Sequence, residues 1–382
     1  MSIVFVPIES QAGEGRVAAV PETVRRYVKA GLEVCVERGA GLGAHVPDAD
    51  FEAAGATLCG PELWGECDVL FKVQPPTVEE VGRLKEGAIC VSLVLPAANL
   101  KSVDALAKRK ITSLALDLVP RITRAQSMDV LSSQATVGGY KAVLLGASHM
   151  AKMCPLLMTA AGTVPPAKVV VFGAGVAGLQ AIATAKRLGC LVEATDVRMA
   201  VKEQVESLGA KFIEVPGAED MEDERGYAKE ATPEFLEKQK EEVAKRVAEA
   251  DLVITTAQIP GRAAPRLVTE AMVQSMSAGS VIVDMAVESG GNCELSKLGE
   301  IVVEHGVSIV GVANLPGTIP THASELFSKN ILNLTSPFFA EGGNLELDHE
   351  DDVIAGCLLT HAGEVKHAPT ADLLGANTEV AS

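Results

Sequence analysis

Residues 168–196 read KVVVFGAGVAGLQAIATAKRLGCLVEATD, and this stretch decides the fold of the chain. An apolar strand leads into the pattern G-x-G-x-x-G, which is formed by Gly173, Gly175 and Gly178. A helical segment follows the glycines, and a second apolar strand ends at Asp196. A strand, a glycine turn, a helix and a second strand with a terminal carboxylate form the complete context of a dinucleotide-binding βαβ unit.

Each part of this pattern has a chemical use. Gly173, Gly175 and Gly178 let backbone N–H groups approach a pyrophosphate at the start of the helix, and they are predicted to bind it. Asp196 is predicted to accept hydrogen bonds from ribose hydroxyls and to repel a 2′-phosphate, which favours NAD(H) over NADP(H). Arg198 leaves two interpretations open, because it can accommodate such a phosphate or be a solvated loop charge.

Apolar segments alternate with helical ones beyond the opening stretch. Four more strands are expected at residues 211–215, 251–256, 280–286 and 307–312, which gives the six strands of a Rossmann fold. An acidic segment rich in Gly and Pro interrupts this order, and a mobile loop is expected at about residues 216–232. The loop is either simply solvated or a lid that carries Tyr227 to a ligand.

The first 120 residues of the chain show a second alternation of this kind. Strands are expected at residues 2–8, 32–37, 67–73, 87–95 and 111–119, with amphipathic helices between them. The last 40 or so residues carry weak strand signals and no core of their own, so they are expected to return to the first domain. The fold class is therefore α/β, with two Rossmann-like domains, each a mostly parallel sheet flanked by helices, and a cleft between them. The domains are expected at 1–132 plus 325–382, and at 133–324.

Composition narrows the functional class. The 382 residues suit two domains of about 150 to 200 residues each. A net charge of −17 and 3% aromatic residues disfavour nucleic acid binding. No apolar run of about 18 residues and no charged n-region is present, so we expect a cytoplasmic protein without a membrane span or signal peptide. Eight scattered cysteines without metal-ligand spacing predict reduced thiols and no metal site.

Residues 121–140 read RITRAQSMDVLSSQATVGGY and are unusually polar for this chain. One interpretation is a helix that begins near Thr123, because Thr123 and Gln126 have the spacing of a capping box and Asp129 falls in the first turns. The other is functional. On such a helix Gln126, Asp129 and Ser132 form one polar stripe, with Arg121 just ahead of it.

The sequence offers little for acid–base chemistry. Hydride transfer between two nicotinamides requires positioning of the rings, whereas a carbonyl substrate calls for a histidine or lysine acid. The seven histidines fall in expected turns, helices and the tail, without an obvious candidate. Arg16 and Lys72 could bind a substrate carboxylate, and they favour the alternative of an amino-acid dehydrogenase.

The chain resembles the NAD(H)-binding component of proton-translocating nicotinamide nucleotide transhydrogenase over essentially its whole length. The resemblance is carried by GEGRVAAVPETV, FKVQPP, PRITRAQSMDVLSSQATVGGY, MTAAGTVPPAKVVVFGAGVAGLQAIATAKRLG, TDVR, VKEQVESLGAKF, GYAKE, TTAQIPGRAAP and VDMAVESGGNCE. Related alanine dehydrogenases share the fold, the glycine pattern and the early Arg and Lys. They lack the polar segment and use a histidine after the strand near residue 93, where this chain reads VSLVLPAAN.

The resemblance implies roles for particular residues. Arg121, Gln126, Asp129 and Ser132 are implied to line the nicotinamide end of the site as its catalytic residues. Cofactor contacts are implied for Arg121, Ile122, Thr123, Arg124, Gln126, Gly173, Gly175, Val176, Gly178, Asp196, Val197, Arg198, Gly226 and Tyr227. Two positions depart from the family pattern: Gln258 stands where an apolar residue is expected, and Thr123 where serine is expected.

The resemblance also implies an activity and partners. The expected reaction is direct hydride transfer from NADH to NADP⁺ bound on a partner domain, coupled to proton translocation. The expected assembly is a homodimer on the cytoplasmic face of a membrane, bound to an NADP(H)-binding domain and a membrane-spanning subunit. This chain corresponds to the arrangement in which the NAD(H) component is a separate subunit. An alanine-type dehydrogenase and a non-catalytic NAD(H)-sensing module remain the alternatives.

Overall fold

The chain forms two compact units. The computed structural model describes residues 1–214, 233–259, 262–340 and 342–380. Unit 1 comprises Met1–Gln134 and Pro316–Ser382, and unit 2 comprises Ala135–Leu315. No helix within the described ranges is both long enough and apolar enough to cross a membrane.

The second boundary between the units falls earlier than the sequence suggested. The sequence placed it after residue 324, whereas unit 2 ends at Leu315. The physical reason is helix α10 (Pro320–Thr335), which buries Phe327, Ile331 and Leu334 in the core of unit 1. The first boundary was expected after residue 132, and the units divide after Gln134.

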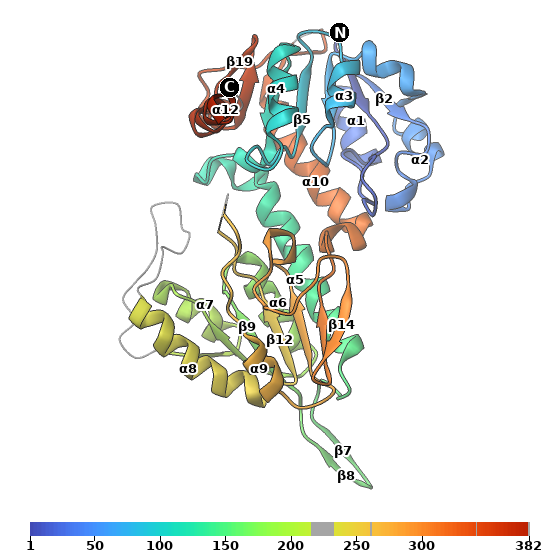
Figure 1. Ribbon diagram of the computed structural model, residues 1–382. Coiled ribbons are helices and arrows are strands. Elements are labelled where there is room, and N and C mark those ends of the chain that lie inside the picture. The colour runs from blue at the N-terminus through green and yellow to red at the C-terminus, as the bar shows by residue number, and fades with distance from the viewer. Residues whose placement is uncertain (215–232, 260–261, 341, 381–382) are drawn as a thin grey trace. The chain divides into compact units, whose positions relative to one another are not determined.

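Unit 1 is built on an eight-stranded sheet (Figure 1). Its strands, in spatial order, are β19 (Glu364–Val365), β18 (Leu358–His361), β6 (Thr112–Ala115), β5 (Ile89–Ser92), β4 (Val69–Phe71), β1 (Ile3–Val6), β2 (Glu33–Glu37) and β3 (Thr57–Cys59). Strands β1 to β6 pair in parallel, and β18 joins the edge of β6 in antiparallel orientation. The C-terminal segment therefore completes the sheet that the N-terminal segment begins.

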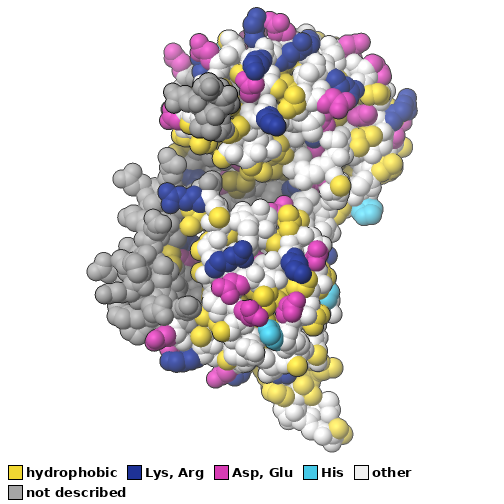
Figure 2. Space-filling model, in the orientation of Figure 1, with side chains coloured by type: hydrophobic (Ala, Val, Ile, Leu, Met, Phe, Trp, Pro, Cys, Tyr) yellow, Lys and Arg dark blue, Asp and Glu magenta, His cyan; other side chains and the backbone are white. Residues whose placement is uncertain are grey.

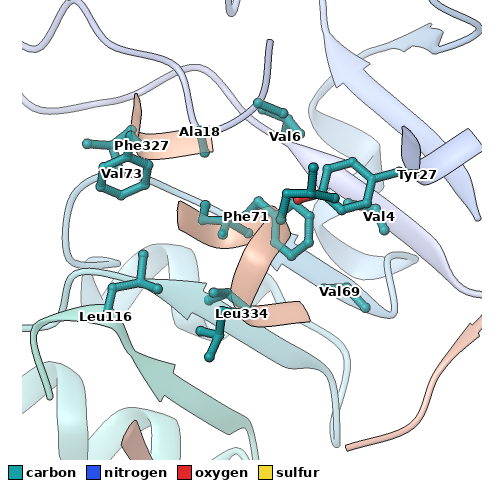
Figure 3. Close-up of a cluster of buried hydrophobic side chains, with 14 of the residues drawn as sticks. Val4, Val6, Ala18, Tyr27, Val69, Phe71, Val73, Leu116, Phe327 and Leu334 are labelled. Carbon is teal, nitrogen blue, oxygen red and sulfur yellow. The ribbon is translucent and has the colours of Figure 1, made fainter. Parts of the chain in front are cut away.

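Both faces of this sheet are buried. Val4 and Val6 of β1 point into a core shared with α1 (Pro21–Lys29) and α10, as Figure 3 shows. Phe5 points into a second core with α3 (Val78–Arg83) and α4 (Leu100–Lys108). Successive strand residues alternate between the two faces, so a strand buried on both sides is apolar throughout. The remaining helices of the unit are α2 (Asp48–Ala53), α11 (Asp352–Cys357) and α12 (Ala368–Val380).

Unit 2 contains a seven-stranded sheet. Its spatial order is β11 (Lys211–Phe212), β10 (Leu191–Thr195), β9 (Lys168–Phe172), β12 (Leu252–Thr255), β13 (Val281–Asp284), β15 (Val307–Val310) and β14 (Ile301–Glu304). The first six are parallel and fall within the six expected segments. The edge strand β14 is antiparallel and was not expected, because most of its residues are exposed and it lacks the buried apolar pattern.

Helices cover both faces of this second sheet as well. Val169 and Val171 of β9 share a core with α6 (Val176–Arg187), and Val170 shares another with α8 (Pro233–Glu249). The other helices of the unit are α7 (Lys202–Ser207), α9 (Glu270–Ser275) and most of α5 (Val130–His149). The expected α/β fold with two mostly parallel, helix-flanked sheets is confirmed.

The polar segment at 121–140 does not begin a helix at Thr123. Residues Thr123–Met128 form the 3₁₀ helix η4, and α5 (Val130–His149) begins after it. The expected capping box is wrong, because Ile122 is the N-cap of η4 and no side chain caps it. Asp129 lies between the two helices and bonds the first turn of α5. The chain therefore turns a corner at Asp129.

A hairpin interrupts the chain between α5 and β9. Strands β7 (Leu157–Thr159) and β8 (Gly162–Val164) pair in antiparallel orientation and form a separate two-stranded sheet (Figure 1). All six of these residues are exposed. The sequence suggested only a Pro- and Gly-rich connection here, because two three-residue strands carry too little pattern to be recognised.

Candidate functional site

The corner at Asp129 lines a cavity in unit 1. The cavity has a volume of ≈ 330 Å³, which lies within the range of small-molecule sites. Its lining residues are Pro120, Arg121, Ile122, Thr123, Ala125, Gln126, Asp129 and Ser132. The structure thus brings together Arg121, Gln126, Asp129 and Ser132, the four residues expected to be catalytic. The set combines a cation, an amide, a carboxylate and a hydroxyl, which can meet both donors and acceptors of a ligand.

Asp129 and Ser132 are bonded to each other. The Asp129 Oδ1 accepts from the backbone N–H of Ser132 at 2.9 Å, and its Oδ2 accepts from the Ser132 hydroxyl at 2.6 Å. A carboxylate at the start of a helix is also favoured by the helix dipole. Asp129 therefore caps α5, and this bonding fixes the direction in which its carboxylate and the serine hydroxyl face the cavity.

Arg124 is directed elsewhere. Its Nη1 and Nη2 donate to the two carboxylate oxygens of Asp351 at 2.7 and 2.9 Å. Asp351 also accepts from the backbone N–H groups of Val353 and Ile354 at the start of α11. The Arg124 hydrogen bonds, with smaller contributions from these N–H groups, lower the pKa of Asp351 to about 2. Arg124 is not among the residues that line the cavity, and its side chain anchors the segment to Asp351.

Sequence reasoning missed Asp351 because no local pattern points to it. Arg124 and Asp351 are 227 residues apart in the chain and meet only in the folded unit. The one signal in the sequence was the Asp-rich start of a short helix, which by itself predicts a cap.

Arg16 and Lys72 are buried and already paired with carboxylates of unit 1. Arg16 donates from Nη2 to Glu14 at 2.6 Å and from Nη1 to the Gln134 side chain at 2.8 Å. The Lys72 ammonium lies 2.8 Å from Glu9 and 3.7 Å from Glu80. Each cation would have to exchange a partner in order to bind a substrate carboxylate.

The pKa values of the two buried carboxyl groups, Glu14 and Glu9, shift in opposite directions. Burial raises the pKa of Glu14, but hydrogen bonds and charge from Arg16, together with Gln74, outweigh it and lower the pKa to about 2. Burial also raises the pKa of Glu9, and here it outweighs the opposing effects of Lys72 and two backbone N–H groups. Unpaired ions are costly to bury, so these pairs are expected to persist on ligand binding.

The glycine pattern forms the expected turn in unit 2. Gly173 follows β9 with φ of +91°, a conformation that favours glycine. A Cβ on Gly178 would lie 1.8 Å from the Gly173 carbonyl oxygen, so the helix can approach the strand only without a side chain there. Gly175 is the N-cap of α6, and Val176 begins the helix. The first-turn N–H groups have no partners within the helix, and this arrangement fits a dinucleotide pyrophosphate.

Asp196 stands at the carboxyl end of β10 and joins this turn to Arg198. Its Oδ2 accepts from the Ala174 N–H at 2.7 Å, and its Oδ1 accepts from the Arg198 N–H at 2.9 Å. The Arg198 guanidinium also bonds both carboxylate oxygens at 3.0 Å. Arg198 is only 15% exposed, so the interpretation as a solvated loop charge is wrong. Val197 lies between them and is half-buried.

A second loop packs against the glycine turn and was not singled out as a site. The Thr256 hydroxyl donates to the Phe172 carbonyl at 3.0 Å. Asn292 accepts from the Ala257 N–H at 3.1 Å and donates to the Ala257 carbonyl at 2.9 Å. Gln258, which departs from the family pattern, donates to the Met285 carbonyl at 3.1 Å and so has a contact within the unit.

Two expected site residues, Gly226 and Tyr227, lie outside the described residues. Within the described ranges, no group of three or more His, Cys, Asp or Glu side chains could hold a metal ion.

Comparisons with known proteins agree over most of the chain. The alanine dehydrogenase/PNT N-terminal domain matches residues 5–138, and the C-terminal domain of the same family matches residues 142–368. A relative from Rhodospirillum rubrum, the first portion of its NAD(P) transhydrogenase subunit alpha, is 51% identical, covering 95% of this chain and 97% of the relative. Alanine dehydrogenase of Mycobacterium tuberculosis is 32% identical over 97% of this chain and 96% of the relative.

The solved structures that match also include a transhydrogenase and an alanine dehydrogenase. A transhydrogenase from Sinorhizobium meliloti matches with a TM-score of 0.88 and 47% identity, covering 95% of this chain and 99% of the other. An L-alanine dehydrogenase matches with a TM-score of 0.81 and 28% identity, covering 98% and 99%.

Proposed function

The chain belongs to the alanine dehydrogenase/PNT family, and from this premise we propose that it is the NAD(H)-binding subunit of a proton-translocating transhydrogenase. In the proposed reaction, a hydride with its two electrons leaves the dihydronicotinamide of NADH and joins the nicotinamide of NADP⁺ on a partner domain. The products are NAD⁺ and NADPH, so no proton has to be supplied by this chain. Proton translocation takes place in the membrane-spanning partner.

The cavity at the Asp129 corner is the observation that carries this proposal. Its eight lining residues include no histidine or lysine that could serve as an acid for a carbonyl substrate. They do include Gln126, whose amide can both donate to and accept from a nicotinamide carboxamide. The resulting role is positioning, which is what transfer between two nicotinamide rings requires.

Four of the eight cavity residues have a role in this proposal. Arg121 supplies a fixed positive charge, and Gln126 orients the ring. Asp129 and Ser132, held to one another, provide a fixed acceptor and a hydroxyl at the same end of the ligand.

The glycine turn of unit 2 holds the remainder of the nucleotide in this proposal. Gly173, Gly175, Val176 and Gly178 take the pyrophosphate, and Asp196 takes the ribose hydroxyls. The carboxylate also disfavours a 2′-phosphate, so this chain takes NAD(H) while the partner holds NADP(H).

The test is stopped-flow hydride transfer between NADH on this protein and NADP⁺ on an added transhydrogenase NADP(H)-binding domain. We expect NADPH to form only when both proteins are present. Formation of NADH from NAD⁺ and L-alanine, without a partner, would instead favour the dehydrogenase alternative. Binding of NADH without either reaction would favour a sensing module.

The dehydrogenase alternative has one specific observation in its favour, because Arg16 and Lys72 are both buried in unit 1 and could bind a substrate carboxylate there. The pairs that both cations already form with Glu14 and Glu9 count against it. We therefore retain it as the second candidate.

We further propose that two copies of the chain form a homodimer through the β7–β8 hairpin. Met153, Leu156, Leu157, Met158 and Val164 in and beside this hairpin are at least 36% exposed, and Met158 is 76% exposed. Figure 2 shows hydrophobic side chains along the protruding hairpin. A contiguous exposed apolar surface of this kind typically marks an interface. The dimer binds the membrane-spanning partner at the cytoplasmic face.

A further inference from the structure

One buried side chain of α10 forms hydrogen bonds with the Asp129 corner but does not line the cavity. The corner comprises residues 126–133, which include the end of η4, Asp129 and the first turn of α5. Asn330 is 6% exposed. Its Nδ2 donates to the Ser127 carbonyl at 2.9 Å, and its Oδ1 accepts from the Ser133 hydroxyl at 2.7 Å.

These two bonds connect the two sides of the corner. Ser127 follows Gln126 on the η4 side, and Ser133 follows Ser132 on the α5 side. The amide of Asn330 therefore links the neighbours of two cavity residues through one rigid plane. Its orientation is fixed, because a flipped amide would place its oxygen against the Ser127 carbonyl, and two acceptors repel each other.

Bonds within the corner do not replace this link. On the α5 side, the short hydrogen bonds between Asp129 and Ser132 fix the position of Ser132 relative to Asp129. The η4 side is connected to Asp129 by a longer bond, from the Asp129 N–H to the Gln126 carbonyl at 3.4 Å. Hydrogen bonds of this length are weak, so the placement of Gln126 relative to Ser132 depends on a support outside the corner.

We propose that Asn330 is a positioning residue for hydride transfer, which sets where Gln126 lies relative to Asp129 and Ser132. This inference rests on the proposed function. Asn330 is not among the lining residues of the cavity, so it acts through Ser127 and Ser133. The sequence motifs did not include it, because it is 203 residues from Ser127 in the chain.

The chain offers a matched control on the same helix. Asn333 is half-buried, and its Nδ2 donates to the same Ser127 carbonyl at 3.1 Å. In the described hydrogen bonds it reaches only the η4 side of the corner. Asn330→Asp keeps the size and the acceptor for Ser133 but turns a negative oxygen toward Ser127. Asn333→Asp makes the same chemical change at a position from which the side chain can turn to solvent.

The experiment measures hydride transfer from bound NADH to NADP⁺ on the partner domain at saturating NADH, together with NADH affinity and thermal melting. For Asn330→Asp we expect a rate about tenfold to a hundredfold lower, because a misplacement of about 1 Å costs on the order of a hundredfold. The affinity for NADH should change by less than about threefold, because the glycine turn still holds the rest of the nucleotide. For Asn333→Asp the rate should stay within about twofold of the wild type, because the Asn330 link remains.

Two results would overturn the role of Asn330: an unchanged rate with a lowered melting temperature, or an equal loss of rate in both variants. If Asn330→Asp does not fold, Ser133→Ala removes the bond to Asn330, together with the bonds of the same hydroxyl to the Val130 carbonyl and the Gln134 amide, and should still slow transfer at unchanged NADH affinity. An unchanged rate in that variant also overturns the role. A wild-type protein that transfers no hydride would contradict the proposed function itself, whereas active wild type beside an equally active variant contradicts only this inference.

Discussion

Asp129 serves two purposes at once. Its carboxylate caps α5 through Ser132, and the same side chain lines the cavity. Loss of an N-cap costs about 0.5 to 2 kcal/mol of stability, so a substitution of Asp129 would change both the fold and the site. Gln126 lines the same cavity but caps no helix. Substitution of Gln126 is therefore better suited than substitution of Asp129 to test hydride transfer without a change in stability.

For Gln126→Asn we expect slower hydride transfer at nearly unchanged NADH affinity. The substitution keeps the amide but shortens its reach by about one methylene, and an error of about 1 Å costs on the order of a hundredfold in rate. Stopped-flow transfer and NADH titration measure the two quantities. Gln204→Asn, at an exposed position of α7, is the control. A normal rate with a lowered melting temperature would return Gln126 to a structural role.

Asp196→Asn tests the origin of nucleotide selectivity. Wild-type protein should bind NADH much more tightly than NADPH, because the carboxylate opposes a 2′-phosphate and pairs with Arg198. The variant removes the negative charge that opposes a 2′-phosphate and keeps the positive charge of Arg198 beside it. We expect the preference for NADH to fall by about tenfold or more, which corresponds to about 1.4 kcal/mol. Calorimetric titration with both nucleotides measures it, and equal binding of the two by the wild type would exclude a selective role for Asp196.

At the scale of elements, the sequence predicted what depends on local pattern. Most parallel strands of the two sheets are continuous apolar segments, so they were found. The short parallel strand β3, the hairpin strands β7 and β8 and the exposed β14 were not. The start of α5 was misplaced, because the Thr123–Gln126 spacing imitates a capping box that the chain does not use. The supports of the cavity, Asn330 and Asp351, come from distant segments, and no local pattern contains that information.

The pair between Arg124 and Asp351 predicts a stability difference that depends on pH. Arg124 lowers the pKa of Asp351 to about 2 in the folded protein, below about 3.9 in an unfolded chain. The carboxylate therefore stabilises the fold above about pH 4, and this contribution is lost as pH falls toward about 2. Asp351→Asn keeps an oxygen for the α11 cap but loses the charge. We expect the wild type to be more stable than the variant near pH 6, by a modest amount because Arg124 is half exposed, with the difference vanishing at low pH.

Denaturant unfolding of both proteins across this pH range measures the difference. Other acidic groups, including Glu14, titrate in both proteins and cancel in the comparison. Asp352→Asn removes a neighbouring negative charge and controls for net charge. A difference that stays constant from about pH 6 to about pH 2 would contradict the pair as its source.

At the scale of the whole molecule, the hairpin predicts the oligomeric state. The side chains of Leu156 and Met158 are 56% and 76% exposed. Burial of this apolar area in an interface would stabilise an assembly, because apolar surface in water is unfavourable in free energy. We expect the wild type to sediment as a dimer, and a variant with Leu156→Asp and Met158→Asp to sediment as a monomer. Leu298→Asp replaces another exposed leucine, 59% exposed, and should leave the dimer intact. A wild-type monomer, or a dimeric hairpin variant, would rule out this interface.

Unit 1 takes its residues from both ends of the chain, with unit 2 inserted between Gln134 and Pro316. Proteins are made from the N-terminus, and domains fold as their residues emerge from the ribosome. All of unit 2 is therefore synthesised while the cavity segment still lacks α10 and α11. A nascent chain that stops after residue 315 has its glycine turn but neither Asn330 nor Asp351. Translation beyond residue 315 thus supplies the supports of the cavity, and products that terminate before it do not contain them.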